Sequence, residues 1–522
     1  MNPLLRPFSK LILLAAWAVA VTLVASAADH GPAPVLKAAA RTFSIQPQVG
    51  WPAKFNDPQG IREVFGDLKG TVVLFEYGST RLCFVTSSLD NIQGAARGDT
   101  GSFGVACRRV VVKELALAPT EVVLAGSHNH TMPAVAVPLP HAWGRDEVPP
   151  AESANEPARE FLQALGQAAR GLDKELVPVS VEWGVAQEKR VTYNRRGRRP
   201  DGRSYLIRTE EERRQHGPDY TGVIDPDAKV MLLRGESGRP VAALAFFTGH
   251  PVTGFNPEVM VSFGQWSQVA CEILSGHLGG IPVGFLQGCA GDVNSKYMLT
   301  GTIQQGIELG RYLGESYIAA VGALHRSKRP GLQWSREKVR IPHADLPVAA
   351  SLERDLASID DFIRRGRAGD PDTLECVGLN FHATLTPPYR AQLVDSVRPW
   401  YVWALDQHRA GKAAEVPKFL EMDIVVARIG DVGFVGLPFE PFVRTGLKIK
   451  REAPLPCVFT SGYTGDSTAE RTYGYIPDAS AVDDREYMAG YFRYVAGRPP
   501  YRSPAGDAAA EVAVAKLTEF SR

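Results

Sequence analysis

The chain of 522 residues lacks several features that would point to particular classes of protein. Its formal net charge is +1 and it has no long run of one sign, so its composition gives no support for a nucleic-acid partner. Its 6 cysteines show no C-x-x-C spacing, which argues against a zinc ribbon, a redox pair or a disulfide scaffold. We expect buried thiols with at most one bridge. Histidine is scarce too, at 11 residues, so histidines placed close together need an explanation.

Long apolar runs are confined to the N-terminus. Arg6 and Lys10 precede an apolar run from Leu11 to Ala27 that ends in Ala-Ser-Ala, the small-x-small form of a signal-peptidase site. We interpret residues 1–27 as a signal peptide and expect an exported chain, periplasmic or secreted, after cleavage near Ala27. An uncleaved membrane anchor is the competing interpretation, because the run approaches the length of a membrane span. No later segment is apolar for long enough to cross a membrane.

Segments of strand and helix character alternate along the rest of the sequence. The runs TVVLFEYG, RLCFVTSSL and EVVLAGS predict strands, and AKVMLLRG with PVAALAFFTGH predicts a hairpin. Residues 28–60 are rich in Pro, Ala and Gly and are expected to form an irregular lead-in. Residues 349–411 hold two helical patterns broken by Pro387-Pro388. No linker divides the remainder, so we predict an α/β fold: a single large domain over residues 61–522, with mixed β-sheets flanked by helices.

Two of the scarce histidines, His128 and His130, lie one residue apart in VVLAGSHNHTMPAV. Residues i and i+2 of a strand project to the same side, so both rings are expected to face one cleft at the end of a strand. The alternative is a pair of hydrogen-bonded loop histidines.

Three other segments have a similar organisation. His250 follows the apolar run AALAFFTG, Glu440 follows VGFVGLPF, and the polar loop GDSTAERTYGYIPD carries Tyr473 and Tyr475. Taken singly, each residue is also typical of a structural loop. Together they offer imidazole nitrogens and a carboxylate, the ligands of catalytic zinc sites that leave a position for water. A phenolate is a further ligand candidate, because a bound cation stabilises it despite an ordinary pKa of about 10.

Six segments in this order resemble the neutral/alkaline, non-lysosomal ceramidases. They are GSHNHTMPAV, YNRR, FFTGHPVTG, FLQGCAGDVN, GLPFEPFVRTGLKIK and YGYIPD…REYMAG. The resemblance covers roughly Val122 to Gly490. It implies an amidohydrolase that uses one zinc ion and water to cleave the amide bond of ceramide-type lipids. The implied zinc ligands are His128, His250, Glu440 and Tyr475.

The resemblance also implies three residues that contact the substrate or assist catalysis. His130 and Arg195 match groups beside the scissile amide or its oxyanion. Tyr487, which follows Tyr475 at the family's spacing, matches a further tyrosine of the site. The Gly-rich turn Gly288–Asp292 is expected to direct backbone N–H groups to the same point, and Asp292 to orient a ligand; a purely structural turn is the alternative.

The sequence departs from the family at two places. Where characterised ceramidases read G-D-V-S-P-N, this chain has Asn294 in place of the serine sometimes proposed as a nucleophile, and Ser295 in place of the proline. A covalent serine mechanism is therefore disfavoured, and metal-activated water is preferred. The family's C-terminal immunoglobulin-like domain is not expected, because the chain ends soon after Tyr487.

The expected partner is a small-molecule or lipid substrate, met by peripheral contact with a membrane surface, and no nucleic acid. Two other functions remain open at this point. One is hydrolysis of another amide or ester on the same metal centre. The other is an exported binding protein that kept the fold and lost turnover.

Overall fold

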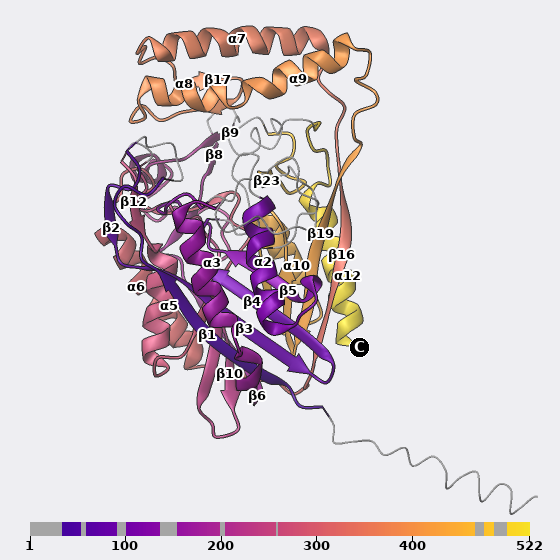
Figure 1. Cartoon of the computed structure of the whole chain (residues 1–522). Helices are drawn as coiled ribbons and strands as arrows, with labels where there is room; N and C mark the ends of the chain where they lie inside the picture. The colour runs from indigo at the N-terminus through magenta and orange to yellow at the C-terminus, as the bar shows by residue number, and fades with distance from the viewer. Residues whose placement is uncertain are drawn as a thin grey trace, which may run out of the picture. The chain divides into compact units, whose positions relative to one another are not determined.

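The computed structural model describes residues 34–53, 59–90, 101–135, 154–198, 204–256, 259–464, 474–484 and 498–522. The chain divides into two units, Met1–Val35 and Leu36–Arg522, and every described helix and strand belongs to the second (Figure 1). The predicted signal peptide lies outside the described residues. Among those residues, no helix combines the length and the apolar character that a membrane span requires.

A large mixed sheet is the main element of the second unit. Across the sheet its strands are β13 (Val283–Gln287), β11 (Pro240–Phe247), β10 (Asp227–Gly235), β6 (Val177–Gln187), β1 (Lys37–Ile45), β3 (Leu68–Tyr77), β4 (Thr80–Ser87) and β5 (Val122–Gly126), with β15 (His325–Arg326) paired to β6. The pairs β11–β13 and β4–β5 are parallel. Strands such as β11 are buried on both faces, which is why they read as continuous apolar runs rather than alternating ones. The predicted hairpin of β10 and β11 is confirmed.

The lead-in expected over residues 28–60 is wrong for Lys37–Ile45. These residues form β1, which pairs with β3 along its whole length and also with β6. The segment has few large apolar residues, and its alanines pack because the neighbouring strands cover them. The compact unit therefore begins at Leu36 rather than at residue 61.

A smaller mixed sheet packs face to face on the large one. Its strands are β16 (Leu332–Pro342), β19 (Phe419–Ile429), β20 (Val432–Gly436) and β22 (Cys457–Ser461), of which β20 and β22 are parallel. Aromatic side chains fill the space between the sheets. Phe84 meets Phe434 edge-on with ring centres 4.9 Å apart, and Phe246 meets Phe459 at 5.6 Å.

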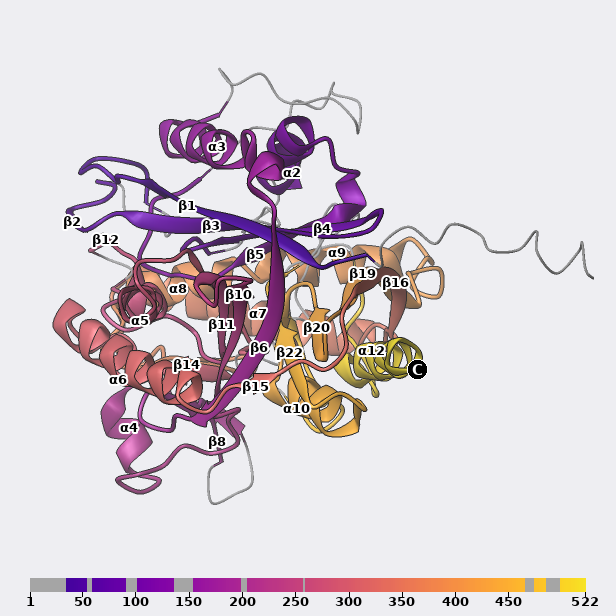
Figure 2. The same cartoon turned by 90° about the horizontal axis from the view of Figure 1, so that it is seen from below.

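Helices cover the outer faces of both sheets, which gives four layers (Figure 2). The large sheet is covered by α2 (Gly101–Leu115), α3 (Glu156–Ala169), α5 (Gln265–His277) and α6 (Ile303–Val321). The small sheet is covered by α10 (Val443–Glu452) and α12 (Gly506–Ser521). The predicted fold class, α/β with mixed sheets flanked by helices, is confirmed.

A separate helical layer contains α7 (Ala349–Arg367), α8 (Pro387–Asp395) and α9 (Arg398–Arg409) (Figure 1). These helices share their own apolar core, which includes Trp400 and Phe362. Helices lie on both sides of Pro387-Pro388, as expected, but these prolines begin α8, and a further helix, α9, follows it. Proline suits the first turn of a helix, where the missing N–H has no intrahelical partner.

Short elements complete the fold around the ends of the long strands. The paired strands are β2 (Glu63–Phe65) with β12 (Val261–Phe263), β7 (Thr192–Asn194) with β14 (Val293–Ser295), β8 (Arg196–Arg198) with β9 (Ser204–Leu206), β17 (Glu375–Cys376) with β18 (Leu379–Asn380), and β21 (Glu440–Pro441) with β23 (Tyr475–Ile476). One short helix, α4, spans Glu210–Arg214. All six cysteines fall in the described residues, and each is a buried free thiol.

A buried group of charges ties the two sheets together. Lys450 of α10 binds Asp225, at 2.6 Å, and Asp227 of β10, while Lys229 of β10 donates to the carbonyl of Val458 in β22 at 2.6 Å. Burial alone would raise the pKa of the Asp227 carboxyl, but the ammonium groups of Lys450 and Lys229 outweigh it. The pKa of Asp227 therefore lies below its usual value.

This network predicts a pH-dependent contribution to stability. A carboxyl with a lowered pKa in the folded state stabilises the fold above its unfolded pKa of about 4, and that stabilisation is lost as the pH falls through the folded pKa. Asp227→Asn should lower the free energy of unfolding at pH 7 by about 1–3 kcal/mol, between the values of exposed and buried pairs. Urea unfolding of both proteins at pH 7 and pH 3 should show the difference shrinking in acid. Asp406→Asn, which removes the exposed partner of Arg409, is the control and should change little. A difference that stays constant with pH would contradict the assignment.

Candidate metal and catalytic site

The carboxyl ends of three parallel strand pairs meet at one place. Asp90 follows β4 and His128 follows β5, His250 follows β11, Glu440 follows β20 and Tyr463 follows β22. In open α/β sheets, the carboxyl ends of parallel strands are where ligands bind, because the chain leaves the sheet there in loops. The two packed sheets thus bring residues far apart in sequence to a common point.

The conformation of His128 differs from the sequence-based expectation. Strand β5 ends at Gly126, and His128 has a φ of +63°, the left-handed region that few non-glycine residues adopt. The alternation of a strand therefore does not aim the two rings. His130 nevertheless reaches the same point, because its ring meets that of His128 edge-on with centres 4.8 Å apart. The expected proximity is confirmed and its expected cause is wrong.

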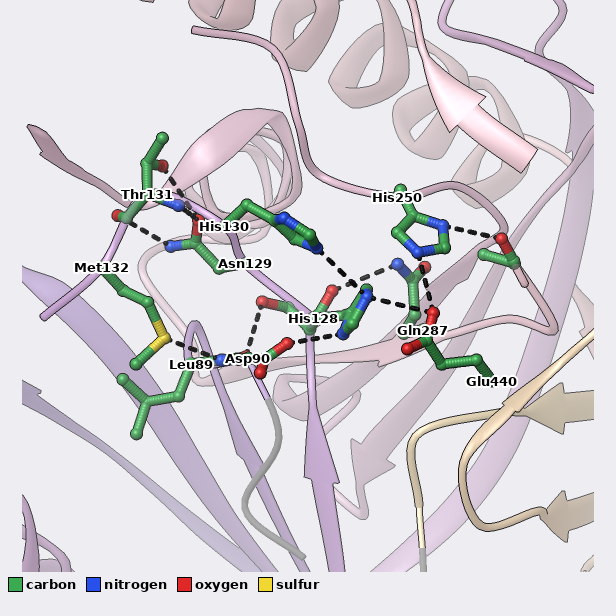
Figure 3. Close-up of polar contacts among 12 residues, drawn as sticks. Leu89, Asp90, His128, Asn129, His130, Thr131, Met132, His250, Gln287 and Glu440 are labelled. Atoms are coloured by element: carbon green, nitrogen blue, oxygen red, sulfur yellow. Dashed lines mark hydrogen bonds and ion pairs between the residues drawn. The ribbon is translucent and has the colours of Figure 1, made fainter. Parts of the chain in front are cut away.

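Three ring or carboxylate atoms converge at the centre of the site (Figure 3). The Nε2 atom of His250 lies 3.0 Å, and that of His128 3.4 Å, from the same Glu440 oxygen, Oε2. The Nε2 atom of His130 lies 3.2 Å from that of His128. His128 and His250 are buried and His130 is half-buried.

The opposite nitrogens of His128 and His250 identify their tautomers. The Nδ1 atom of His250 lies 2.7 Å from the carbonyl oxygen of Ala290, and that of His128 lies 2.6 Å from the Asp90 carboxylate. The Ala290 oxygen can only accept a hydrogen bond, so Nδ1 of His250 carries the proton, and the nearby Asp90 carboxylate favours a proton on Nδ1 of His128. In the neutral rings both Nε2 atoms then face Glu440 with lone pairs. A cation bound between the two Nε2 atoms and the Glu440 oxygen would accept a lone pair from each of them. The residues present therefore fit a metal ion.

The charged groups around His128, His250 and Glu440 shift the pKa of each of these side chains. Burial lowers the pKa of His128, but the carboxylates of Glu440 and Asp90 outweigh it and the pKa lies above its ordinary value. Burial would raise the pKa of Glu440, yet His128 and His250 hold it well below the usual range. Burial, the Arg195 guanidinium and His128 lower the pKa of His250 to about 3, so its ring stays neutral.

Two overlapping sets of residues offer ligand atoms for a metal. Among the described residues, His128, His130 and His250 form a group in which one ring nitrogen of each lies within 4.8 Å of those of the others. The set predicted from the sequence has Glu440 and Tyr475 in place of His130. Both sets contain His128 and His250. Imidazole nitrogens suit borderline divalent ions, and the predicted set adds the carboxylate of Glu440.

Arg195 lies beside this centre, as predicted, and is held rigidly. Its guanidinium donates to the carbonyl of Gly291 at 2.7 Å and to Oδ1 of Asn294 at 3.0 Å, and its Nη2 lies 3.5 Å from Nε2 of His250. The side chain is buried. The residue at the family's serine position, Asn294, thus positions the arginine. The hydroxyl of Ser295 instead accepts hydrogen bonds from the Thr253 hydroxyl and from the N–H of Val252.

The two predicted tyrosines differ in what can be described. Tyr475 begins β23 and pairs directly with Glu440 of β21. Its ring lies under the Arg195 guanidinium at 5.3 Å, and its centre is 6.4 Å from that of His250. Tyr475 therefore borders the centre, on the side of Arg195 and His250. Tyr487 and Tyr473 lie outside the described residues.

Two N–H groups of the Gly-rich turn bind within the fold rather than facing the site. The N–H groups of Gly288 and Gly291 donate to the backbone carbonyls of Phe247 and Pro441 and therefore tie strands together. The carboxylate of Asp292 accepts from the Asn194 side chain and from the N–H of Val443, at 2.9 and 2.8 Å, rather than from a histidine. Burial raises the pKa of Asp292. Its effect on the site is indirect, since Asn194 precedes Arg195.

Sequence reasoning missed three residues of the site: Asp90, Gln287 and Tyr463. Gln287 ends β13, and its buried amide donates to the carbonyls of Ser127 and Gly249, the residues just before His128 and His250. Tyr463 stacks on His128 with ring centres 4.3 Å apart, and burial, followed by the charge of Glu440, raises its pKa well above the usual range. His250 and Glu440 were predicted because each is a polar residue soon after an apolar strand. Asp90 and Tyr463 have the same pattern.

Comparisons with known proteins agree with this description at the level of the fold. No family model matches the chain, and a search of the curated proteins finds no match. The chain is similar to the crystal structure of neutral ceramidase from Pseudomonas aeruginosa, with a TM-score of 0.58 and 15% identity, over 94% of this chain and 75% of that one. It is similar to a ceramidase complexed with C2 over the same shares, with a TM-score of 0.60 and 14% identity. The chain therefore has the fold of neutral ceramidase, as the resemblance implied.

The contact between Asp90 and His128 predicts that Asp90 controls metal affinity. A carboxylate that fixes the tautomer of a metal-binding histidine typically contributes 10- to 100-fold to affinity. Asp90→Ala should weaken zinc binding by about that factor, and Asp90→Asn by less, because the amide oxygen still accepts from Nδ1. Competition with a chromogenic chelator measures the affinities. Asp225→Asn, at a buried aspartate bound to Lys450, is the control and should leave zinc affinity unchanged. Equal affinities for the wild type and Asp90→Ala would show that the contact has no such role.

Proposed function

We propose that this chain is a zinc-dependent amidohydrolase that cleaves the amide bond of N-acyl lipids of the ceramide type. The observation that carries the proposal is the convergence of His128 and His250 on one oxygen of Glu440, with Arg195 fixed beside them, within the fold of neutral ceramidase. Fold alone does not define chemistry, so the argument rests on what these side chains can do.

His128, His250 and Glu440, with Tyr475 at the edge, are the residues that would hold the ion. When bound, zinc supplies a Lewis acid and lowers the pKa of water to about 7. Asp90 and the carbonyl of Ala290 keep the Nδ1 protons in place, so that both Nε2 lone pairs remain available. The neutral state of His250 supports this role, because a protonated imidazole cannot bind a metal.

Arg195 has the properties of an oxyanion-stabilising group. Its charge is buried, and two hydrogen bonds fix the guanidinium, so little reorganisation is needed when negative charge develops on a carbonyl oxygen. Asn294 contributes by holding Arg195. A carboxamide is not a nucleophile, and the Ser295 hydroxyl is engaged elsewhere. Both facts favour attack by water over a covalent serine intermediate.

His130 is the candidate proton-transfer group. It is the one half-buried ring of the three histidines, and it meets His128 and Phe255 edge-on. In this proposal it accepts the proton of the attacking water and delivers one to the leaving amine, the usual work of a catalytic imidazole. A role for Tyr487 beside the substrate rests on the family resemblance. Export, and peripheral contact with a membrane surface where such lipids reside, belong to the same proposal.

The decisive experiment combines metal analysis with a lipid assay. The purified chain should bind about one zinc ion and release fatty acid from N-acylsphingosines, because a catalytic zinc site uses a single set of ligands. The double variant His128→Ala/His250→Ala should lose both zinc and activity, since it removes two of the converging donors. Mass spectrometry of the native protein gives the metal content, and chromatography of the released fatty acid gives the rate.

Other outcomes would replace parts of the proposal. Absence of bound zinc after reconstitution, or full activity of the double variant, would overturn the mechanism. Turnover of simple amides or esters while ceramides stay intact would keep the chemistry and change the substrate. Retained zinc with no turnover of any amide or ester would favour a binding protein.

The geometry of Arg195 predicts a graded pair of effects. Arg195→Ala should lower kcat by about 10²- to 10³-fold, the usual loss for an oxyanion donor. Asn294→Ala should lower kcat by only about tenfold, because Arg195 keeps its bond to the Gly291 carbonyl. Arg198→Ala, at an exposed position of the neighbouring strand β8, is the control and should match the wild type. Steady-state kinetics measure all three. An Asn294→Ala variant that is less active than Arg195→Ala would point to a direct role for the asparagine.

A further inference from the structure

Tyr463 is a buried residue of this site that neither the sequence motifs nor the family resemblance assigns. It lies two residues after β22 and is fully buried. Its ring stacks on that of His128, with centres 4.3 Å apart and planes inclined by 28°, and meets that of His250 at right angles with centres 6.0 Å apart. It therefore contacts the rings of both histidines shared by the two candidate metal sets.

The backbone of Tyr463 joins the segment that carries His128 to the segment that carries Glu440. Its N–H donates to the carbonyl of Phe439, the residue before Glu440, at 2.9 Å. Its carbonyl accepts from the N–H of Gly126, two residues before His128, at 3.4 Å. Its φ of +53° is in the left-handed region, as are those of His128 and Phe439 at +63°. Such conformations persist in non-glycine residues only where the surroundings impose them, and they concentrate at functional sites.

The hydroxyl of Tyr463 has no hydrogen-bond partner among the residues that the structure describes. Buried tyrosine hydroxyls usually find a partner, because leaving one unpaired is unfavourable. Burial, and then the charges of Glu440 and Tyr475, raise the pKa of this hydroxyl, whereas the Arg195 guanidinium lowers it, so groups that surround His128 and His250 act on it. The unsatisfied donor therefore lies where a bound ligand is expected.

A second tyrosine shows that an unpaired hydroxyl alone does not mark a site. The Tyr317 hydroxyl on α6 also has no partner among the described residues, and that side chain is fully buried too. Tyr317 packs in the apolar cluster between α5, α6 and the large sheet, among residues such as Leu274 and Leu313. Burial, and then the neighbouring Cys271 thiol, raise the pKa of Tyr317. Tyr317 is thus a matched control for burial and for a missing partner.

We propose that the Tyr463 hydroxyl is a hydrogen-bond donor to an oxygen atom of the ligand bound among His128, His250 and Glu440, while its ring fixes the plane of His128. The inference rests on the proposed function in one respect, because it requires a metal centre whose ligand bears oxygen. In hydrolysis that oxygen belongs to the substrate carbonyl or to the attacking water. Tyr463 and Arg195 then approach the same oxygen as two donors, one neutral and one charged.

The test compares Tyr463→Phe with Tyr317→Phe. Each variant removes one unpaired hydroxyl and keeps the ring, so the melting temperature of each metal-free protein should equal or exceed that of the wild type. Zinc affinity of Tyr463→Phe should change far less than the 10- to 100-fold loss expected of an orienting partner, because the stacked ring remains. Binding of acetohydroxamate, an oxygen ligand for zinc, should weaken by about 10- to 100-fold in Tyr463→Phe only.

Activity gives a second, separate readout. In Tyr463→Phe the kcat for the lipid substrate should fall about tenfold or more with KM little changed, and Tyr317→Phe should match the wild type. If the wild type hydrolyses no N-acyl lipid, the proposed function fails, and acetohydroxamate binding still decides the role of Tyr463. The inference is overturned if Tyr463→Phe binds acetohydroxamate as the wild type does, if the zinc-loaded wild type does not bind it, or if the variant loses thermal stability in proportion to its other losses.

Discussion

The packing of two mixed sheets, each with parallel strand pairs, is the constraint on which the site depends. Two parallel neighbouring strands both end at the same edge of a sheet. Face-to-face packing then brings the edges of the two sheets together. The large sheet contributes His128 and His250 in this way, and the small sheet contributes Glu440. The aromatic contacts between the sheets, such as Phe84 with Phe434, fix the spacing of these side chains as well as the core.

The loops at these strand ends are each held by several hydrogen bonds, which explains how they keep unfavourable backbone conformations. Gln287 binds the backbone just before both histidines, and Tyr463 links the backbone beside His128 to that beside Glu440. His128, Phe439 and Tyr463 all have positive φ, each at some energetic cost. A buried network of backbone contacts can impose such strain because releasing it in one residue would break hydrogen bonds in two sheets.

The sequence predicts those parts of the fold and the site whose pattern lies within one short segment of the chain. Strands β3, β4, β5, β10 and β11 were predictable because each is an apolar run of strand length, and His250 and Glu440 because they directly follow such runs. Strand β1 was missed because its alanines become core residues only through their neighbours. The left-handed turn at His128 has no sequence signature, so the correct pairing with His130 was predicted for the wrong reason. Gln287 could not be found, since its partners lie on loops distant in sequence.

The charges of the site divide it into two sides with different chemistry. On one side, Asp90 and Glu440 raise the pKa of His128, so this side attracts a cation. On the other, burial and Arg195 lower the pKa of His250, and the Arg195 guanidinium offers a fixed positive charge to an anion. Placing carboxylates and a guanidinium so close together in a buried site is unfavourable unless each charged group has hydrogen-bond partners. The network of Asp90, Gln287 and Asn294 supplies those partners, which is why residues that never need to touch a substrate are integral to the chemistry proposed here.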